Sequence, residues 1–139
     1  MLATAHDPAQ AGANADRVRH ATAIHLNEQI DRRTASNVQS YVNSSHATIR
    51  KRLRELDHEW DVDRVLAVKA STLALAGLAL GMTGKRKWLA LPAAAMAFLL
   101  QHRVQGWCPP TAVLRRLGVR TRGEIEREKH ELISLMRRR

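Results

Sequence analysis

Apolar residues are distributed unevenly along the 139-residue chain. Between Val65 and Leu100 they form two nearly continuous runs, VLAVKASTLALAGLALGM and WLALPAAAMAFLL, which a short basic turn separates. Elsewhere they recur every three or four residues among charged side chains, which is the period of an amphipathic helix. Val, Ile, Tyr and Phe are too scattered to mark strands. The pattern predicts an all-α protein with an apolar two-helix hairpin, transmembrane in character, flanked by amphipathic helices on both sides.

The segment before the apolar runs predicts a tail and three helices. Residues 1–16 have neither a basic start nor an apolar run, so we expect a disordered tail rather than a signal peptide. Two helices are expected over Asp16–Ile30 and Thr34–Val42, with Thr34 as the N-cap of the second. A third carries one apolar stripe, Ile49, Leu53, Leu56 and Trp60. This helix either covers its own protein or a partner helix, or lies in a membrane interface, which its mixed charges disfavour.

Polar signals divide the rest of the chain. Asp61 predicts the N-cap of the first apolar helix, and Pro109 and Pro110 are expected to end the second. A short basic helix over 111–117 should stop at Gly118. The capping box Thr121-Arg-Gly-Glu124 predicts a last helix with one apolar side. The expected organisation is a tail (1–16), N-terminal amphipathic helices (17–60), a membrane hairpin (61–108) and basic C-terminal helices (109–139).

Three features favour insertion of the hairpin in a membrane. The first run has eighteen residues, which rise about 27 Å as a helix and nearly match the hydrocarbon core of about 30 Å. The three tryptophans flank the runs and suit the two interfacial belts; they are Trp60, Trp88 and Trp107. Gly77 and Gly81 form a Gly-x-x-x-Gly pair, which permits close helix packing.

Two features oppose insertion. The second run has only thirteen residues, about 20 Å of helix, and its continuation Gln101–Gln105 is polar. Lys69 also interrupts the first run. In an antiparallel hairpin Lys69 and Arg103 lie at a similar depth near the open end, where long basic side chains reach the interface. The alternative is a soluble helical oligomer that buries the hairpin between subunits.

The net charge of +10 arises entirely within or after the hairpin, since residues 1–64 contain nine bases and nine acids. Basic residues beside an apolar segment suit anionic lipid headgroups. In a nucleic-acid-binding protein, basic residues are more often concentrated in one recognition helix. Ten bases flank the two runs, against three in the turn, which predicts that both termini are cytoplasmic. The ten are Arg50, Lys51, Arg52, Arg54, Arg64, Arg103, Arg115, Arg116, Arg120 and Arg122.

The segment from Trp60 to Gly118 resembles the YgaP-type inner-membrane domain, a bacterial family. The resemblance rests on Asp63-Arg-Val-Leu66, a glycine-containing first span and Gly106-Trp-Cys-Pro109, followed by Leu114-Arg-Arg-Leu-Gly118. It covers under half the chain. It implies a self-associating membrane hairpin in the bacterial inner membrane, here without the rhodanese sulfurtransferase domain that some members carry. Gln101, His102 and Arg103 depart from the apolar pattern of the family.

Cys108 is the single candidate for chemistry. It is the only cysteine, so an internal disulfide and a multi-cysteine zinc site are excluded. Basic neighbours favour a reactive thiolate, and the rhodanese link implies a persulfide relay. The bland interpretation is a small residue packed at a turn, and the end of a helix would disfavour a thiolate. The histidines form no ligand pattern, so neither a metal nor a cofactor is expected.

Three functions from different classes therefore remain. The preferred one is a non-enzymatic membrane anchor, an accessory or scaffold subunit that self-associates or binds a larger complex. The second is a soluble basic oligomer that binds nucleic acid or another acidic partner, with salt-sensitive affinity. The third is a thiol or persulfide relay through Cys108 at the membrane surface.

Overall fold

The computed structural model describes residues 17–138, so the predicted tail over 1–16 lies outside the described residues. Helices make up 81% of the described residues, which contain no strand. The predicted all-α class is therefore confirmed. After a helical turn at 17–20, the elements are α2 (Ile24–Ser40), α3 (His46–His58), α4 (Val62–Met82), the 3-10 helix η1 (Arg86–Leu89), α5 (Ala90–Gln105), α6 (Pro109–Arg116) and α7 (Arg122–Arg137).

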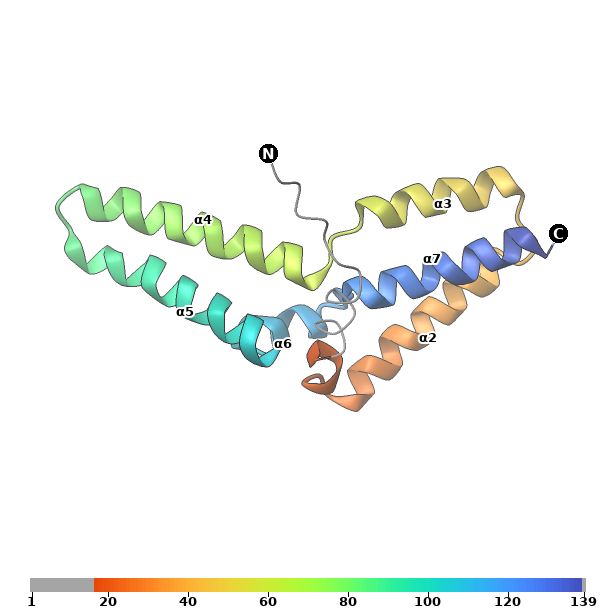
Figure 1. Ribbon diagram of the computed structural model, residues 1–139, viewed down its shortest axis with the longest axis horizontal. Helices are drawn as coiled ribbons and strands as arrows, with labels where there is room; N and C mark the ends of the chain where they lie inside the picture. Colours follow the sequence, from red (N-terminus) through yellow and green to blue (C-terminus); the bar gives the residue numbers. More distant parts are fainter. Residues whose placement is uncertain (1–16, 139) are drawn as a thin grey trace, which may run out of the picture.

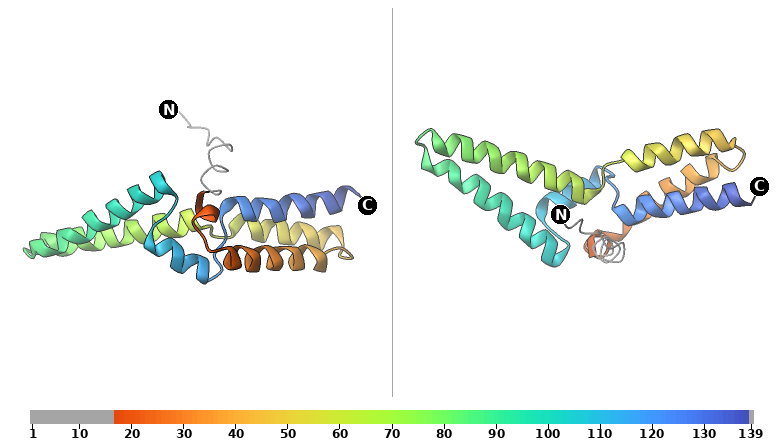
Figure 2. Two further views of the ribbon diagram at one scale, coloured as in Figure 1. Left: turned by 90° about the horizontal axis from the view of Figure 1, so that it is seen from below. Right: turned by 45° about the horizontal axis from the view of Figure 1, so that its top comes forward.

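The helices are arranged in two parts that point in opposite directions from α6 (Figures 1 and 2). Helices α4 and α5 run antiparallel, joined through η1, and we call α4, η1 and α5 the apolar arm. Helices α2, α3 and α7 form the second part, which we call the polar body. Both described ends of the chain, residues 17 and 138, belong to the side of the polar body and α6 rather than to the tip of the arm (Figure 1).

A small apolar cluster joins α3 to α7 in the polar body. Ile49 and Leu56 of α3 are fully buried against Ile125 and Leu132 of α7. Met136 packs at the edge of the cluster. The α3 stripe thus covers its own protein, while Trp60 lies beyond the end of α3, half-exposed beneath the Arg64 guanidinium.

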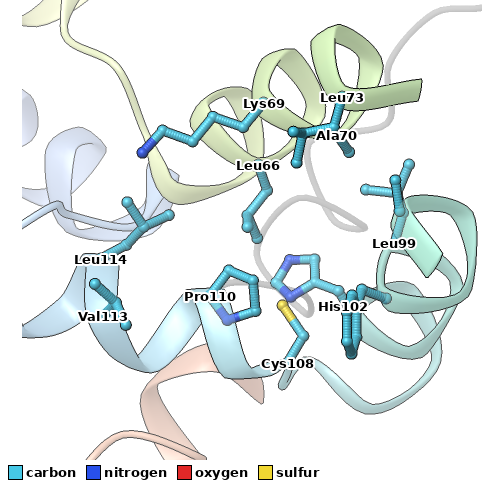
Figure 3. A pocket seen from close by; sticks show the side chains of 12 residues that line it. Leu66, Lys69, Ala70, Leu73, Leu99, His102, Cys108, Pro110, Val113 and Leu114 are labelled. Atoms are coloured by element: carbon cyan, nitrogen blue, oxygen red, sulfur yellow. The ribbon is translucent and has the colours of Figure 1, made fainter. Parts of the chain in front are cut away.

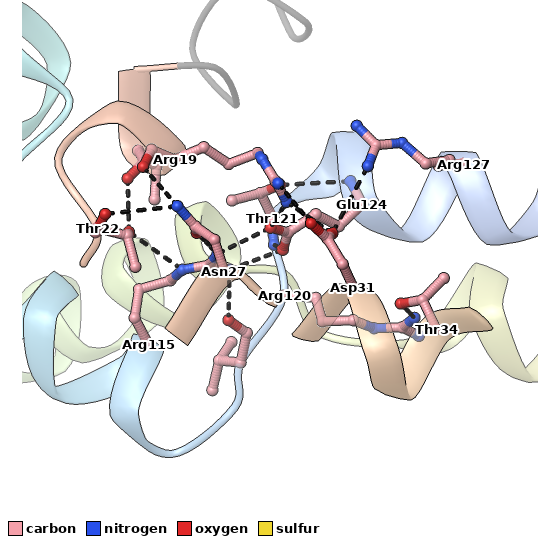
Figure 4. A network of polar contacts seen from close by, with 12 residues as sticks. Arg19, Thr22, Asn27, Asp31, Thr34, Arg115, Arg120, Thr121, Glu124 and Arg127 are labelled. Carbon is pink, nitrogen blue, oxygen red and sulfur yellow. Dashed lines mark hydrogen bonds and ion pairs between the residues drawn. The ribbon is translucent and has the colours of Figure 1, made fainter. Parts of the chain in front are cut away.

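Buried ion pairs join α2 and α6 to α7 (Figure 4). Arg115 donates two hydrogen bonds to Glu124, of 2.6 and 2.8 Å, and both side chains are almost fully buried. Arg19 links Glu124 to Asp31, at 2.6 and 2.8 Å. A second set centres on Glu128, which accepts from Arg52 and Arg120. No buried side-chain nitrogen or oxygen in the described part lacks a partner, so burial of these charges is compensated by hydrogen bonds.

The N-terminal helices differ from the predicted pair. A single α2 runs through Thr34, whose hydroxyl accepts a hydrogen bond from Arg120 instead of capping a helix. The break falls earlier, at 21–23. There the Asn27 amide donates to the carbonyls of Arg19 and Thr22 and ties the two segments together. The predicted boundary between Ile30 and Thr34 was wrong because a tertiary contact satisfies the Thr34 side chain.

The other capping predictions are confirmed. Asp61 caps α4 by accepting a hydrogen bond from the Arg64 N–H at 2.7 Å. Thr121 and Glu124 form the capping box of α7. Gly118 follows α6 with a positive φ of 79°, a conformation that favours glycine.

Candidate functional site

An apolar pocket of about 280 Å³ lies where α6 meets the apolar arm (Figure 3). Its walls are Leu66, Ala70 and Leu73 of α4, Ala95, Phe98 and Leu99 of α5, and Pro110, Val113 and Leu114 of α6. His102 and Cys108 also line it, and they are its buried polar groups. Lys69 stands at one edge. The pocket is close to the lower limit of small-molecule sites, about 300 Å³.

The spacing between α4 and α5 produces this pocket. A Cβ on Gly77 would lie 2.5 Å from the Pro92 side chain, and one on Gly81 would lie 2.5 Å from Leu89. The two glycines therefore allow close contact of the arm's helices near the tip. Toward the polar body the helices diverge (Figure 1), and α6 fills the opening through Leu114, which packs with Leu66, Val62 and Cys108.

Cys108 lies in the short connection between α5, which ends at Gly106, and α6, which begins at Pro109. Gly106, with a φ of 71°, terminates α5. A Cβ at Gly106 would lie 2.4 Å from the Cβ of Arg17. Both the positive φ and this contact therefore exclude a larger residue. Pro109 and Pro110 begin α6 instead of ending α5, since the first turn of a helix tolerates proline. The prediction that these prolines end the second apolar helix was wrong, and Cys108 is the N-cap of α6.

Four side chains form one hydrogen-bonded chain at the floor of the pocket. The Cys108 Sγ lies 3.0 Å from the Thr111 Oγ1. That hydroxyl lies 3.3 Å from Nδ1 of His102. Nε2 of the same ring lies 2.8 Å from Oδ1 of Asp63. Cys108, Thr111 and His102 are all buried. This series of hydrogen bonds therefore runs from the pocket to the partly exposed Asp63 at the start of α4.

The direction of each hydrogen bond follows from the chemistry of the groups. The hydrogen bond from His102 outweighs burial and holds the pKa of Asp63 below its ordinary value, so Asp63 is an ionised acceptor. His102 then donates from Nε2, and in the tautomer that carries its single N–H there Nδ1 is an acceptor. With this tautomer Thr111 donates to Nδ1, and its oxygen is free to accept the Cys108 S–H. The thiol proton therefore has a continuous path to the imidazole.

The structure places the predicted interface residues at the two ends of the arm. Trp88 belongs to η1 at the tip, while Trp60 and Trp107 lie near the base, and all three are exposed. Lys69 and Arg103 are exposed as well. His102, which precedes Arg103 in the polar continuation of the second run, is instead buried against Asp63 and Thr111.

Sequence reasoning missed Asp63, His102 and Thr111 as members of one site. In the sequence, Asp63 was noted only as part of the motif Asp63-Arg-Val-Leu66, and His102 only as a polar departure from the pattern of the family. The sequence signal that could have found the site was that Asp63 and His102 lie at similar distances from the tip of the predicted antiparallel hairpin. Within residues 17–138, no group of three His, Cys, Asp or Glu side chains is arranged to hold a metal ion.

Comparisons of the chain with family models, with curated proteins and with solved structures gave no match. The resemblance to the YgaP-type domain therefore remains a prediction that rests on the residues between Trp60 and Gly118.

Proposed function

We propose that the protein is a non-enzymatic anchor of the bacterial inner membrane, in which the stretch Val65–Leu100 forms a transmembrane hairpin. The observation that carries this proposal is the exposure of the apolar arm. Between residues 67 and 101 only Gly77 and Ala95 are buried. Large side chains at the surface include Leu75, Leu78 and Phe98. A continuous apolar surface of this kind marks a membrane or protein interface.

The length of the helices supports lipid as the medium that surrounds the apolar arm. Within the described residues one helix is long and apolar enough to cross a membrane, and 17% of its apolar stretch is buried. The stretch belongs to α4, whose 21 residues rise about 31 Å. The returning segment is longer than its thirteen-residue apolar run suggests, because η1 and α5 together rise about 32 Å. The α4 leg therefore matches the hydrocarbon core, whereas the second leg reaches this length only with the polar residues at its two ends.

Polar and aromatic residues at the ends of the arm support the same proposal. The basic turn Lys85–Lys87 and Trp88 occupy the tip, while Lys69, Arg103 and Trp107 are near the base. Aromatic rings and snorkelling bases are favoured at the two interfaces. Anionic headgroups are the expected partners of these bases.

Orientation rests on the count of bases near the spans. Three of the ten flanking bases, Arg52, Arg115 and Arg120, are held in ion pairs with buried carboxylates of α7. The other seven still exceed the three in the turn. The positive-inside rule then places the polar body and both termini in the cytoplasm. There the body would provide the surface for self-association or for docking to a larger membrane complex, as an accessory or scaffold subunit.

Fractionation with a matched pair of variants tests the proposal. Leu75→Arg changes an exposed position in the middle of α4, and Ile24→Arg changes a similarly exposed position in α2, at 68% and 76% exposure. Arginine at the centre of a transmembrane helix costs about 2.5–3.5 kcal/mol. We expect the wild type and Ile24→Arg to remain in carbonate-washed membranes and Leu75→Arg to be depleted from them.

The alternative is a soluble oligomer whose subunits bury the arm against each other. That alternative predicts recovery of the wild type in the soluble fraction without detergent. It also predicts a defined oligomer that Leu75→Arg dissociates. Either recovery of the wild type without detergent or equal membrane fractions for both arginine variants would overturn the membrane proposal.

A further inference from the structure

We infer that Cys108 is an acyl acceptor: its thiol, exposed only to the apolar pocket and coupled through Thr111 to His102 and Asp63, takes a medium- or long-chain acyl group from an activated thioester. This goes beyond the anchoring role and does not depend on it. Three features of the molecule support it: the pocket, the hydrogen bonds that link Cys108 to Asp63, and the first turn of α6.

The pocket determines what reaches the thiol. Cys108 is buried and lines the pocket at its floor. Leu73, Phe98 and Val113 also line the pocket, and they are exposed apolar side chains. A space of about 280 Å³ suits part of an alkyl chain. An apolar chain is therefore favoured over a charged or strongly polar reagent.

The hydrogen-bonded chain provides the proton acceptor. As the sulfur attacks the acyl carbonyl carbon, the thiol proton passes to Thr111 while the Thr111 proton passes to Nδ1 of His102. Asp63 stabilises the resulting imidazolium through the 2.8 Å hydrogen bond to Nε2. Collapse of the intermediate forms the Cys108 thioester and expels the donor thiolate, which takes the proton back along the same path. One thioester is exchanged for another, so no oxidant or reductant is required.

The first turn of α6 restricts the kind of compound that can donate the acyl group. Pro109 and Pro110 have no N–H, and the Thr111 N–H already donates to the Cys108 carbonyl at 2.9 Å. The helix start therefore lacks the backbone donors that stabilise an oxyanion in acyl-transfer enzymes. This favours an already activated thioester over an oxygen ester, and an acceptor site over a hydrolase.

The experiment uses the purified full chain in a sterol-based detergent, which lacks a flexible alkyl chain that would occupy the pocket. Acetyl, octanoyl and palmitoyl thioesters of coenzyme A are the probes, and hydroxylamine-sensitive acylation of Cys108 is followed by mass spectrometry. We expect octanoyl transfer to be at least tenfold faster than acetyl transfer, and Cys108→Ser to give no thioester. Absence of an adduct on Cys108, or equal rates for acetyl and octanoyl donors, would overturn the inference.

Two pairs of variants test the relay and the pocket separately. Thr111→Val keeps the side-chain shape and removes the relay, whereas Thr72→Val removes an exposed hydroxyl of α4 that bonds only its own helix. We expect Thr111→Val to lower the maximal rate about 100-fold, with the half-saturating concentration unchanged. Ala70→Trp should fill the pocket and abolish the chain-length preference, while Ala76→Trp, on an exposed face of α4, should not.

If Thr111→Val fails to fold, Asp63→Asn replaces it, because Asp63 is the partly exposed last member of the hydrogen-bonded series. It should lower the maximal rate by at least tenfold and leave the chain-length preference intact. Wild-type rates in the folded relay variants would contradict the proton path.

Discussion

At the scale of single residues, the polar body depends on charges that are buried in pairs. The Arg115 guanidinium contacts Glu124, Asn27, Thr22 and the Val119 carbonyl, so each of its donors faces an acceptor. Removing one member of such a pair leaves a buried charge without compensation, which costs about 3–5 kcal/mol. The energetic importance of these residues therefore lies in the penalty for breaking a pair more than in the attraction itself.

Arg115→Met should lower the free energy of unfolding of the body by about 3–5 kcal/mol, because Glu124 remains buried. Chemical denaturation in detergent, followed by circular dichroism, measures the change. Arg122→Met is the control, since the Arg122–Glu126 pair is an exposed i,i+4 contact at 3.1 Å and is expected to contribute about 0.3–0.5 kcal/mol. Similar losses in the two variants would show that burial of the Arg115 pair is energetically unimportant.

The carboxylates of the same network make the body sensitive to acid. The hydrogen bond from Arg19 holds the pKa of Asp31 below its ordinary value. Burial alone would raise the pKa of Glu124, but Arg115, the Thr121 N–H and Arg19 outweigh burial and lower it. For both groups the unfolded chain binds protons more tightly than the folded one. Their stabilisation is complete above the ordinary carboxyl pKa of about 4 and is lost as pH falls through the folded values.

The melting temperature of the body should therefore be nearly constant from neutral pH to about pH 5 and fall steeply below about pH 4. Thermal melts across this range measure the dependence. Asp31→Asn should reduce the acid-dependent part, whereas Glu28→Gln, at an exposed carboxylate of the same helix, should leave it unchanged. An identical acid profile for Asp31→Asn and the wild type would exclude Asp31 as a contributor.

At the scale of elements, the local signals in the sequence predict the helices well where a cap or a turn controls the boundary. Asp61, Gly118 and the Thr121–Glu124 box determine ends through contacts within four residues. The failures occur where a distant contact decides. Thr34 bonds Arg120 rather than its own helix, and Gly106 ends α5 beside Arg17. These contacts join residues about 90 positions apart, which no local pattern contains.

The candidate site shows the same limit. Cys108 stood out because it is the only cysteine, but its partners come from α4, α5 and α6. Of the acids of α7, only Glu124 was given a role, in the capping box, yet Glu124 and Glu128 are both buried. Amphipathic patterns treat every charge as exposed, and only the packed structure reveals which charges are paired inside.

Close contact between α4 and α5 at the two glycines is open to test by enlarging one of them. Gly77→Val should destabilise the arm by about 1–3 kcal/mol, because its Cβ would overlap Pro92 and Leu91. Ala76→Val adds similar bulk at the neighbouring exposed position and should change stability by about 0.5 kcal/mol or less. Thermal melts of both variants in detergent compare them. Equal stability would mean that α4 and α5 are not closely packed at Gly77.

At the scale of the whole molecule, the apolar arm and the polar body differ in how they bury their surfaces. The body buries apolar residues and ion pairs within itself, whereas the arm exposes most of its apolar side chains. Water favours the surface of the body but not the exposed apolar surface of a single arm. The proposed membrane anchor would have the arm in lipid and the body in water, with α6 and the pocket at the boundary.

Topology labelling tests this arrangement most directly. In a Cys108→Ser background, Lys85→Cys places a thiol at the tip of the arm and Ser36→Cys places one on an exposed position of α2. Intact bacterial spheroplasts are treated with a membrane-impermeant maleimide before or after lysis. We predict that the tip thiol is labelled before lysis and the α2 thiol only afterwards. Labelling of the tip only after lysis would contradict the transmembrane hairpin.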